Sequence, residues 1–171
     1  MQRYFVKNEQ IKGSTVSIHG QDYHHIKNVM RMKTGDNVYI CDQVENVYLA
    51  SIIEIAAEEI ILKIIETIVY QSELKCSVAI ALGLTRREKQ EEVLRRITEL
   101  GADGFLTVSM ERSIVKAKGN AEKIIERQRS IAKEAAEQSQ RRRIPRIYGN
   151  LSFDEFLIFS DDFDLTLFAY E

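Results

Sequence analysis

Several common marks of function are missing from this sequence of 171 residues. It has no tryptophan, one proline, two cysteines and three histidines. Its eight glycines are scattered, and none belongs to a G-x-G-x-x-G or G-x-x-x-x-G-K phosphate-binding loop. No apolar run approaches the roughly 18 residues of a membrane-spanning helix, and the N-terminal stretch MQRYFVKNEQ lacks the regions of a secretory signal. We therefore expect neither a membrane protein nor an enzyme built on a glycine-rich nucleotide loop.

The cysteines and histidines do not predict a metal site. Cys41 and Cys76 each lie in an apolar run typical of a strand, and two cysteines are too few for a metal site. His19, His24 and His25 have no cluster of cysteines or carboxylates at ligand spacing. Without an export signal, we expect both cysteines to be buried, reduced thiols in a cytoplasmic protein. Of the two adjacent histidines, we expect His24 to pack in the barrel and His25 to lie on the surface.

Positive charge, by contrast, is concentrated between residues 112 and 146. This segment contains 11 Lys and Arg against 4 Asp and Glu, although the net charge of the whole chain is −2. Residues 147–171, which follow, contain six acidic residues and no basic ones. A local excess of this kind is typical of a surface that contacts the phosphates of RNA or another polyanion. A solvated helix face with one sign of charge is the alternative interpretation.

Residues 1–70 have the pattern of a small β-barrel. Runs rich in β-branched and aromatic residues alternate with turns and predict strands at residues 3–6, 15–20, 37–42, 47–55 and 58–70. The apolar residues Tyr23, Ile26, Val29 and Met30 have the spacing of one helix face and predict a helix over residues 21–32. The alternation in residues 58–68 is imperfect, so a buried helix there is an alternative.

Beyond a polar boundary at residues 71–75, strands alternate with helices. The expected strands are residues 77–84, 104–110, 144–148 and 164–171, and the expected helices are residues 86–100, 120–140 and 152–159. The apolar run at residues 77–84 predicts a strand buried on both faces of a sheet. Residues suited to helix ends stand at the helix limits: Thr85 with Glu88, Gly101, Asn120, Pro145, and Ser152 with Glu155. This order predicts an α/β domain with a mainly parallel sheet.

Five stretches of the sequence, taken in order, resemble one family. They are RYF (3–5), HHIKNVMRMKTGD (24–36), EKQEEVLRRITELGA (88–102), ERSIVK (111–116) and EAAEQSQRRRIP (134–145). Their order and spacing resemble the RsmE family of 16S ribosomal RNA uridine-N3 methyltransferases, which belongs to the SPOUT superfamily. The pieces TELG and EQ-x-x-R-x-x-IP are the more specific ones, and the resemblance runs from Arg3 to Glu171.

The resemblance implies a PUA-like β-barrel, an RNA-binding domain, at residues 1–72 and a SPOUT methyltransferase domain at residues 73–171. It also implies S-adenosylmethionine as methyl donor, a homodimer with the active site at the subunit interface, and 16S ribosomal RNA of the small subunit as substrate. In this family a GPEGG-type loop and an LG-x-x-ILR-x-ETA segment follow a strand similar to LTLFAYE and form the trefoil knot and the donor pocket. Neither is present, so we expect a chain truncated before the knot, with Tyr170 and Glu171 at the edge of the cofactor site.

The chemistry of uridine methylation indicates what the basic residues would do. N3 of uridine carries a proton at neutral pH, so methylation needs a base that takes this proton or positive charge that stabilises the uridinate. Arg112, Lys116 and Arg141 match the family's basic positions and are candidates to stabilise that anion or to bind phosphates. Glu137 is the candidate general base, and an ion pair with Arg141, one turn along the same helix, is the alternative.

Other polar residues are candidates for RNA contact. Gln138 is suited to recognise a base edge, with helix capping or packing as the alternative. The basic candidates for contact with the RNA backbone are Arg3, Lys27, Arg31, Lys33, Arg86, Arg87, Lys89, Arg142 and Arg143. For those in the first domain, solvated surface is the alternative. Gln128 stands where the family often has tryptophan. This glutamine therefore removes an aromatic group that could pack or stack. The alternative function for the whole chain is a non-catalytic RNA-binding or ribosome-assembly module.

Overall fold

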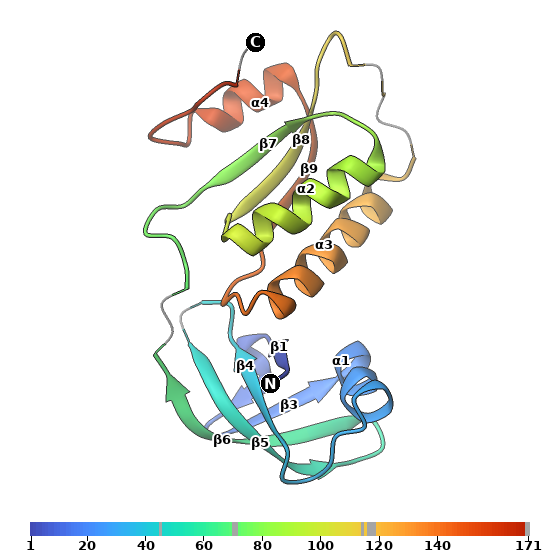
Figure 1. The fold of residues 1–171 in the computed structure, drawn as a ribbon, viewed down its shortest axis with the longest axis vertical. Coiled ribbons are helices and arrows are strands. Elements are labelled where there is room, and N and C mark those ends of the chain that lie inside the picture. The colour runs from blue at the N-terminus through green and yellow to red at the C-terminus, as the bar shows by residue number, and fades with distance from the viewer. Residues whose placement is uncertain (45, 70–71, 114, 116–118, 170–171) are drawn as a thin grey trace. The chain divides into compact units, whose positions relative to one another are not determined.

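The structure is a computed structural model that describes the chain except for residues 45, 70–71, 114, 116–118 and 170–171 (Figure 1). The chain forms two compact units. Unit 1 comprises Met1–Glu73 and Ala136–Ile144, and unit 2 comprises Leu74–Ala135 and Pro145–Glu171. The helix over Ala121–Gln138 therefore begins in unit 2 and ends in unit 1.

Unit 1 is built on a curled sheet of six strands (Figure 1). In sheet order these are β1 (Arg3–Phe5), β4 (Asn37–Cys41), β5 (Val47–Ile55), β6 (Glu59–Ile68), β3 (Thr15–His19) and β2 (Ile11–Lys12). β1 pairs with β4 in parallel, and the neighbouring strands pair antiparallel. The register of β5 and β6 shifts twice, and such bulges bend a sheet. Residues 58–68 thus contain a strand, and the helix alternative is wrong.

Alternate strand residues fill the core of unit 1, because side chains two apart lie on the same face of a strand. The buried set from the strands is Val16, Ile18, Val38, Ile40, Ala50, Ile52, Ile60 and Leu62. Ile26 joins this core from a short helical segment made of α1 (Gly20–His24) and the π-helical turn His25–Val29. The predicted helix is therefore shorter than residues 21–32. Val29 and Met30, which were assigned to its core face, are exposed, because the helical turn ends at Val29.

Residues Ala136–Ile144, called the return segment below, complete unit 1. Ala136 is buried in a cluster with Phe5, Cys41 and Val47, so the end of the long helix packs against β1, β4 and β5. The helix stops after Gln138. Gln140 has a φ of 59°, and the backbone N–H of Arg141 donates to the carbonyl oxygen of Ala136 at 2.9 Å. A left-handed residue with a backward hydrogen bond is a usual helix ending.

Unit 2 contains a parallel sheet of three strands, in the order β7 (Ala79–Gly83), β8 (Gly104–Ser109) and β9 (Arg146–Ser152). Its helices are α2 (Arg87–Leu100), α3 (Ala121–Gln138) and α4 (Phe153–Ser160). On the central strand β8, Leu106 and Val108 pack against Phe156 of α4. Phe105 and Thr107 occupy the alternate positions of β8 and therefore face the other side, along which α2 and α3 lie (Figure 1).

Most of the predicted helix ends are confirmed. Gly101 has a φ of 90° at the end of α2, and the Asn120 side chain accepts a hydrogen bond from the Lys123 N–H at 3.2 Å at the start of α3. Ser152 and Glu155 form the reciprocal capping box of α4. The box predicted from Thr85 and Glu88 does not form, because α2 has Arg86 as its cap residue and so begins one residue too late for that pairing.

Three strand predictions are wrong in detail. β7 is an edge strand whose side chains are half-buried or exposed, so it is β8 that is buried on both faces. Cys76 is exposed and lies outside β7, whereas Cys41 is buried as expected. Residues 164–169 form no strand, since they pair with no other strand among the described residues, and Leu167 is 82% exposed. β9 is longer than predicted, because its pairing with β8 continues to Ser152.

The described part of the chain has no helix long and apolar enough to cross a membrane. Within the same residues, no group of three or more His, Cys, Asp and Glu is placed to hold a metal ion.

Candidate functional site

Arg3 anchors the return segment to the sheet of unit 1. Its Nη1 donates to the carbonyl oxygens of Gln140 and Arg141, at 2.8 and 2.7 Å, and its guanidinium lies 5.5 Å from the centre of the Tyr39 ring. The side chain is only 2% exposed. Arg3 was predicted to contact RNA from the surface of the first domain. The guanidinium is buried against two carbonyl groups and does not face solvent, and its contact with RNA stays a prediction.

The three consecutive arginines of the return segment also contact unit 1. Arg141 Nη1 donates to the carbonyl oxygen of Ser72, and the backbone N–H of Arg142 donates to Glu73 Oε1 at 2.6 Å. Arg143 donates from Nε and Nη2 to the carbonyl oxygen of Val44, at 3.1 and 3.0 Å, while its side chain remains exposed. Part of the positive charge counted in the sequence therefore fixes the backbone of the return segment.

The turn that receives Arg143 is itself held by a buried carboxylate. Asp42 Oδ1 accepts from the N–H groups of Val44 and Asn46 at 2.9 and 3.0 Å, and Asp42 Oδ2 accepts from Asn46 Nδ2 at 2.6 Å. A carboxylate that closes its own turn in this way is a common use of aspartate. The carbonyl oxygen of Val44, which accepts from Arg143, therefore lies in a turn that Asp42 stabilises with hydrogen bonds.

Glu137 and Arg141 do not lie one turn apart on a helix, because α3 ends at Gln138. The regular helical spacing assumed for an ion pair between Glu137 and Arg141 is therefore not present, and the role of Glu137 stays a prediction. Glu137 is half-buried in unit 1, near the hydroxyl of Tyr4. Burial first, and then the charges of Asp22 and Glu137, raise the pKa of Tyr4, so this hydroxyl stays protonated.

The neighbours of Tyr4 and Cys41 bear on two expectations about unit 1. The Tyr4 hydroxyl lies 3.0 Å from His25 Nδ1, and the two rings meet edge to face, so His25 is the packing histidine while His24 is exposed, the reverse of the expectation. Burial raises the pKa of the Cys41 thiol to about 11; Arg3 lowers this pKa by a smaller amount, and Asp42 raises it further. Cys41 is therefore a protonated, inert thiol at neutral pH.

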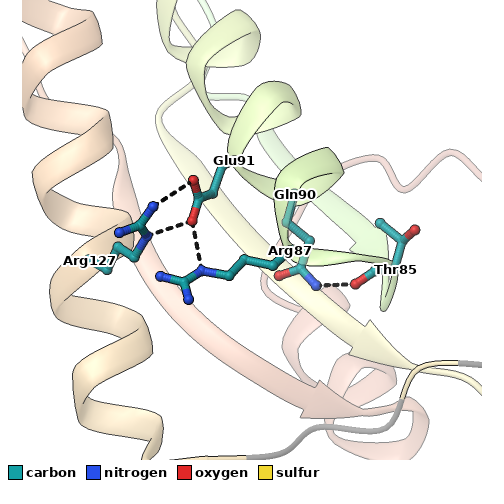
Figure 2. Close-up of polar contacts among 5 residues, drawn as sticks. All are labelled: Thr85, Arg87, Gln90, Glu91 and Arg127. Atoms are coloured by element: carbon teal, nitrogen blue, oxygen red, sulfur yellow. Dashed lines mark hydrogen bonds and ion pairs between the residues drawn. The ribbon is translucent and has the colours of Figure 1, made fainter.

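In unit 2 a carboxylate joins the two helices that lie along the sheet (Figure 2). Glu91 of α2 accepts two hydrogen bonds from Arg127 of α3, Nε to Oε1 at 2.6 Å and Nη2 to Oε2 at 3.0 Å. Arg87 Nε donates to the same Oε1 at 2.9 Å. Hydrogen bonds from Arg127 are the main reason why the pKa of Glu91 lies below its usual range. Arg87, predicted to contact RNA, shares its charge with Glu91 in this cluster.

A cavity of about 590 Å³ lies next to this ion pair within unit 2. Its walls come from the ends of β8 and β9, from the segment between β7 and α2, and from facing sides of α2 and α3. Polar walls are provided by Thr107 of β8, Asn150 of β9 and Gln128 of α3. In open sheets with parallel strands, ligands bind beyond the carboxyl ends of the strands, and this cavity lies at that end of the sheet.

The remaining predicted residues lie on exposed loops or outside the described residues. Arg112 is exposed in the turn that follows β8, Arg86 is exposed at the start of α2, and Arg31 is exposed with a φ of 53°. Gln138 is exposed at the end of α3. The predicted sites at Lys116, Tyr170 and Glu171 lie outside the described residues. The structure therefore brings Arg3 together with the return segment in unit 1, and Arg87 together with Glu91 and Arg127 in unit 2.

Sequence reasoning missed the polar wall of the cavity. Gln128 was noted only as a departure from the family, yet it lies on the apolar stripe of α3 with Ile124, Ile131 and Ala135, at helical spacing. A single amide on such a stripe is a signal that was available. The sequence contains no comparable signal for the ion pair between Glu91 and Arg127, because the two residues are 36 positions apart.

The chain thus combines a curled β unit that carries a basic return segment with a parallel α/β unit that has a cavity at its strand ends. Two family models match: RNA methyltransferase PUA domain over residues 18–65 and RNA methyltransferase domain over residues 72–171. The chain belongs to the RNA methyltransferase family that these two models describe.

Curated relatives agree with this assignment. The chain is 39% identical over 175 residues to the ribosomal RNA small subunit methyltransferase E of Bacillus subtilis, covering 100% of this chain and 68% of that protein. It is 33% identical to the protein of the same name from Synechocystis, covering 91% of this chain and 50% of the relative. The chain thus spans between half and about two thirds of the length of these relatives.

Solved structures share the fold. One, described as a hypothetical protein, has a TM-score of 0.93 at 39% identity and covers 99% of this chain and 71% of its own. Another, the ribosomal RNA small subunit methyltransferase E from Neisseria gonorrhoeae bound to S-adenosyl methionine, has a TM-score of 0.81 at 23% identity and covers 92% of this chain and 65% of its own. The second likeness concerns the fold alone.

Proposed function

We propose that the protein is an S-adenosylmethionine-dependent methyltransferase that methylates N3 of a uridine in 16S ribosomal RNA of the small subunit. The observation that carries the proposal is the 39% identity, over the whole chain, to a relative named ribosomal RNA small subunit methyltransferase E. A homodimer, a cytoplasmic location and the assembled small subunit as substrate belong to the same proposal and rest on the family resemblance.

The two domains have separate tasks in this proposal. Residues 1–72 bind RNA as a PUA-like domain, and residues 73–171 form part of the methyltransferase domain. Arg143, exposed on the return segment, contacts the RNA backbone, as do Arg142 and the exposed Arg31 and Arg86. These contacts position the RNA without selecting its sequence.

Arg112 is the residue best placed to act on the reacting base. It is exposed in the turn directly after β8, at the carboxyl end of the sheet, where ligands of such folds bind. Its guanidinium can stabilise the negative charge that develops on the uracil ring when N3 loses its proton. Arg141 and Glu137 are proposed to assist as anion stabiliser and proton acceptor, and Lys116 and Gln138 as RNA contacts.

The methyl donor supplies an electrophilic methyl group when it is bound. Within the described residues of unit 2, the carboxylate that lines the cavity is Glu91, and two arginines already engage it. That cavity therefore does not fit a sulfonium cation. The proposed cofactor contacts Tyr170 and Glu171 lie outside the described residues, and no catalytic step is assigned to the donor pocket.

The test is methyl transfer from isotope-labelled S-adenosylmethionine to small ribosomal subunits that lack the modification. Digestion and mass spectrometry should detect N3-methyluridine, and reverse transcription should stop at the same nucleotide because its pairing edge is blocked. Arg112→Ala should lower kcat by about 100-fold, whereas Arg95→Ala, at an exposed position of α2, should not. RNA binding with no methyl transfer would instead support the non-catalytic RNA-binding or ribosome-assembly module.

A further inference from the structure

The cavity between α2 and α3 in unit 2 has a buried side-chain oxygen, Gln128 Oε1, for which the described residues supply no hydrogen-bond donor. Gln128 is 6% exposed, lines the cavity, and its Oε1 accepts no hydrogen bond within the described part of the chain. Leaving such a group unpaired costs stability, so native proteins rarely keep one without a reason. A ligand that donates a hydrogen bond to this amide would provide that reason.

The opposite wall of the cavity is polar and already ordered. The Thr107 hydroxyl donates to Asn150 Oδ1 at 3.1 Å, and Asn150 Nδ2 donates to Ser109 Oγ at 2.9 Å. These bonds fix the orientation of the Asn150 amide at the ends of β8 and β9. The cavity thus has two amides, one held by neighbours and one unpaired.

The other surfaces of the cavity suit a flat, uncharged ring. Ile124 and Ile125 of α3 line it, and close packing leaves no spare room beneath them: a methyl group on Gly149 would lie 3.1 Å from Ile125 Cδ1. Lys123, Arg87 and Arg127 also line the cavity and bring positive charge to it. A volume of about 590 Å³ falls within the usual range of ligand sites.

We propose that this cavity binds an unpaired base of the RNA, distinct from the uridine that is methylated; this inference rests on the proposed function. Every base has an edge with an adjacent donor and acceptor, which a glutamine amide can pair with, and the basic side chains suit the adjoining phosphate. Among the described lining residues, amides and a hydroxyl are available, and the carboxylate of Glu91 is engaged by Arg127 and Arg87. Such groups hold a base but cannot take its proton, so the cavity recognises RNA and does not perform the reaction.

The binding test uses a fluorescent single-stranded RNA of twelve nucleotides that contains all four bases, with fluorescence anisotropy as the readout. Gln128→Met removes the amide and keeps the volume of the side chain. It should weaken binding about tenfold, the effect of losing one good amide–base pair. The matched control, Gln21→Met at an exposed position of α1, should bind as the wild type does. Equal RNA affinity of Gln128→Met and the wild type would overturn the proposal.

A thermal melt of Gln128→Met without RNA tests whether misfolding, and not the loss of the amide, causes weaker RNA binding. Gln128→Met should melt at the same or a higher temperature than the wild type, because it removes an unpaired buried amide. A lower melting temperature would mean that the amide is satisfied inside the folded protein, by ordered water for instance, and would count against the base site.

Crosslinking separates this proposal from the proposed function. The same RNA carrying 4-thiouridine should crosslink under ultraviolet light to peptides of α3 around Gln128, and less so in Gln128→Met. Crosslinking at α3 without any methyl transfer would sink the methyltransferase and keep the base site. Methyl transfer with no crosslink at α3, and with an unchanged KM in Gln128→Met, would sink the base site alone. A wild-type protein that binds no RNA would sink both.

Discussion

Arg3 in unit 1 and Gln128 in unit 2 are both almost fully buried polar side chains, but their surroundings differ. Arg3 donates to two carbonyl oxygens and stacks near Tyr39, so its charge ties the return segment to the sheet. Gln128 lines a cavity with an Oε1 that accepts nothing from the described residues. The comparison teaches that burial of a polar group alone does not separate structural residues from functional ones. What separates them is that the fold supplies two acceptors for Arg3 Nη1, whereas no described residue donates to Gln128 Oε1.

The largest effect is expected at Arg3. Arg3→Met should lower the free energy of unfolding by about 3 kcal/mol, because the carbonyls of Gln140 and Arg141 lose a charged donor in a buried place. Urea denaturation measures the change. Arg31→Met, at an exposed basic residue of the same unit, serves as the control and should change stability by less than about 0.5 kcal/mol. Equal losses in the two variants would remove the structural role given to Arg3.

A smaller effect is expected at the Glu91 ion pair. Glu91→Gln should destabilise the protein by about 1 kcal/mol at pH 7, because Arg127 and Arg87 lose a shared carboxylate. Interactions in the folded state lower the pKa of Glu91, so its contribution is present above the unfolded-state pKa of about 4.3 and disappears as the pH falls through the folded-state value. The deficit of the variant should therefore shrink on acidification below about pH 4.3.

The control for this pH dependence is the neighbouring Glu92→Gln, which removes an exposed pair with Lys89. Urea denaturation curves of the wild type, Glu91→Gln and Glu92→Gln at pH 7 and pH 3 measure the difference in the free energy of unfolding. A Glu91→Gln deficit that is the same at both values would show that the carboxylate charge contributes nothing to joining α2 and α3.

The smallest stability effect is expected at Arg143, whose guanidinium contacts Val44 from an exposed position. Arg143→Ala should change the free energy of unfolding by about 0.5 kcal/mol or less. Its effect should appear in RNA binding instead: the slope of log affinity against log salt should fall by about 0.7 for single-stranded RNA. Arg143→Lys should keep that slope because it keeps the charge. If the slope of log affinity against log salt is unchanged in Arg143→Ala, then Arg143 does not contact RNA and the return segment has only a structural role in unit 1.

Local features of the fold were predictable because their causes lie within a few residues. The capping box of Ser152 with Glu155, the Asn120 cap and the left-handed Gly101 follow from spacing alone. Features that depend on distant pairing were not predictable. The sequence predicted a strand at residues 58–70 but could not reject a helix over residues 58–68, because that strand depends on its partners in β3 and β5. The edge position of β7 depends on which strands join the sheet.

The sequence indicated which residues are candidates for the site but not which contacts their side chains make. The charge of residues 112–146 predicted a surface that contacts RNA, and this stays a prediction. Hydrogen bonds to backbone carbonyls leave no mark in a sequence. The contact of Arg3 with Gln140, 137 positions away, could not be inferred for that reason. Gln128 was visible as one polar residue on an apolar stripe, yet only the structure shows that no described neighbour pairs with its Oε1.

The most direct test of this contrast is the melting temperature of the wild type and of Gln128→Met, each with and without saturating single-stranded RNA. Without RNA, the variant should melt at the same or a higher temperature, because it lacks the unpaired amide. With RNA, the wild type should gain more, since at the same RNA concentration a tighter ligand stabilises the folded state more, and the order should reverse. If RNA raises both melting temperatures equally, Gln128 pairs with no base, and the distinction drawn between the buried polar groups of the two units is contradicted.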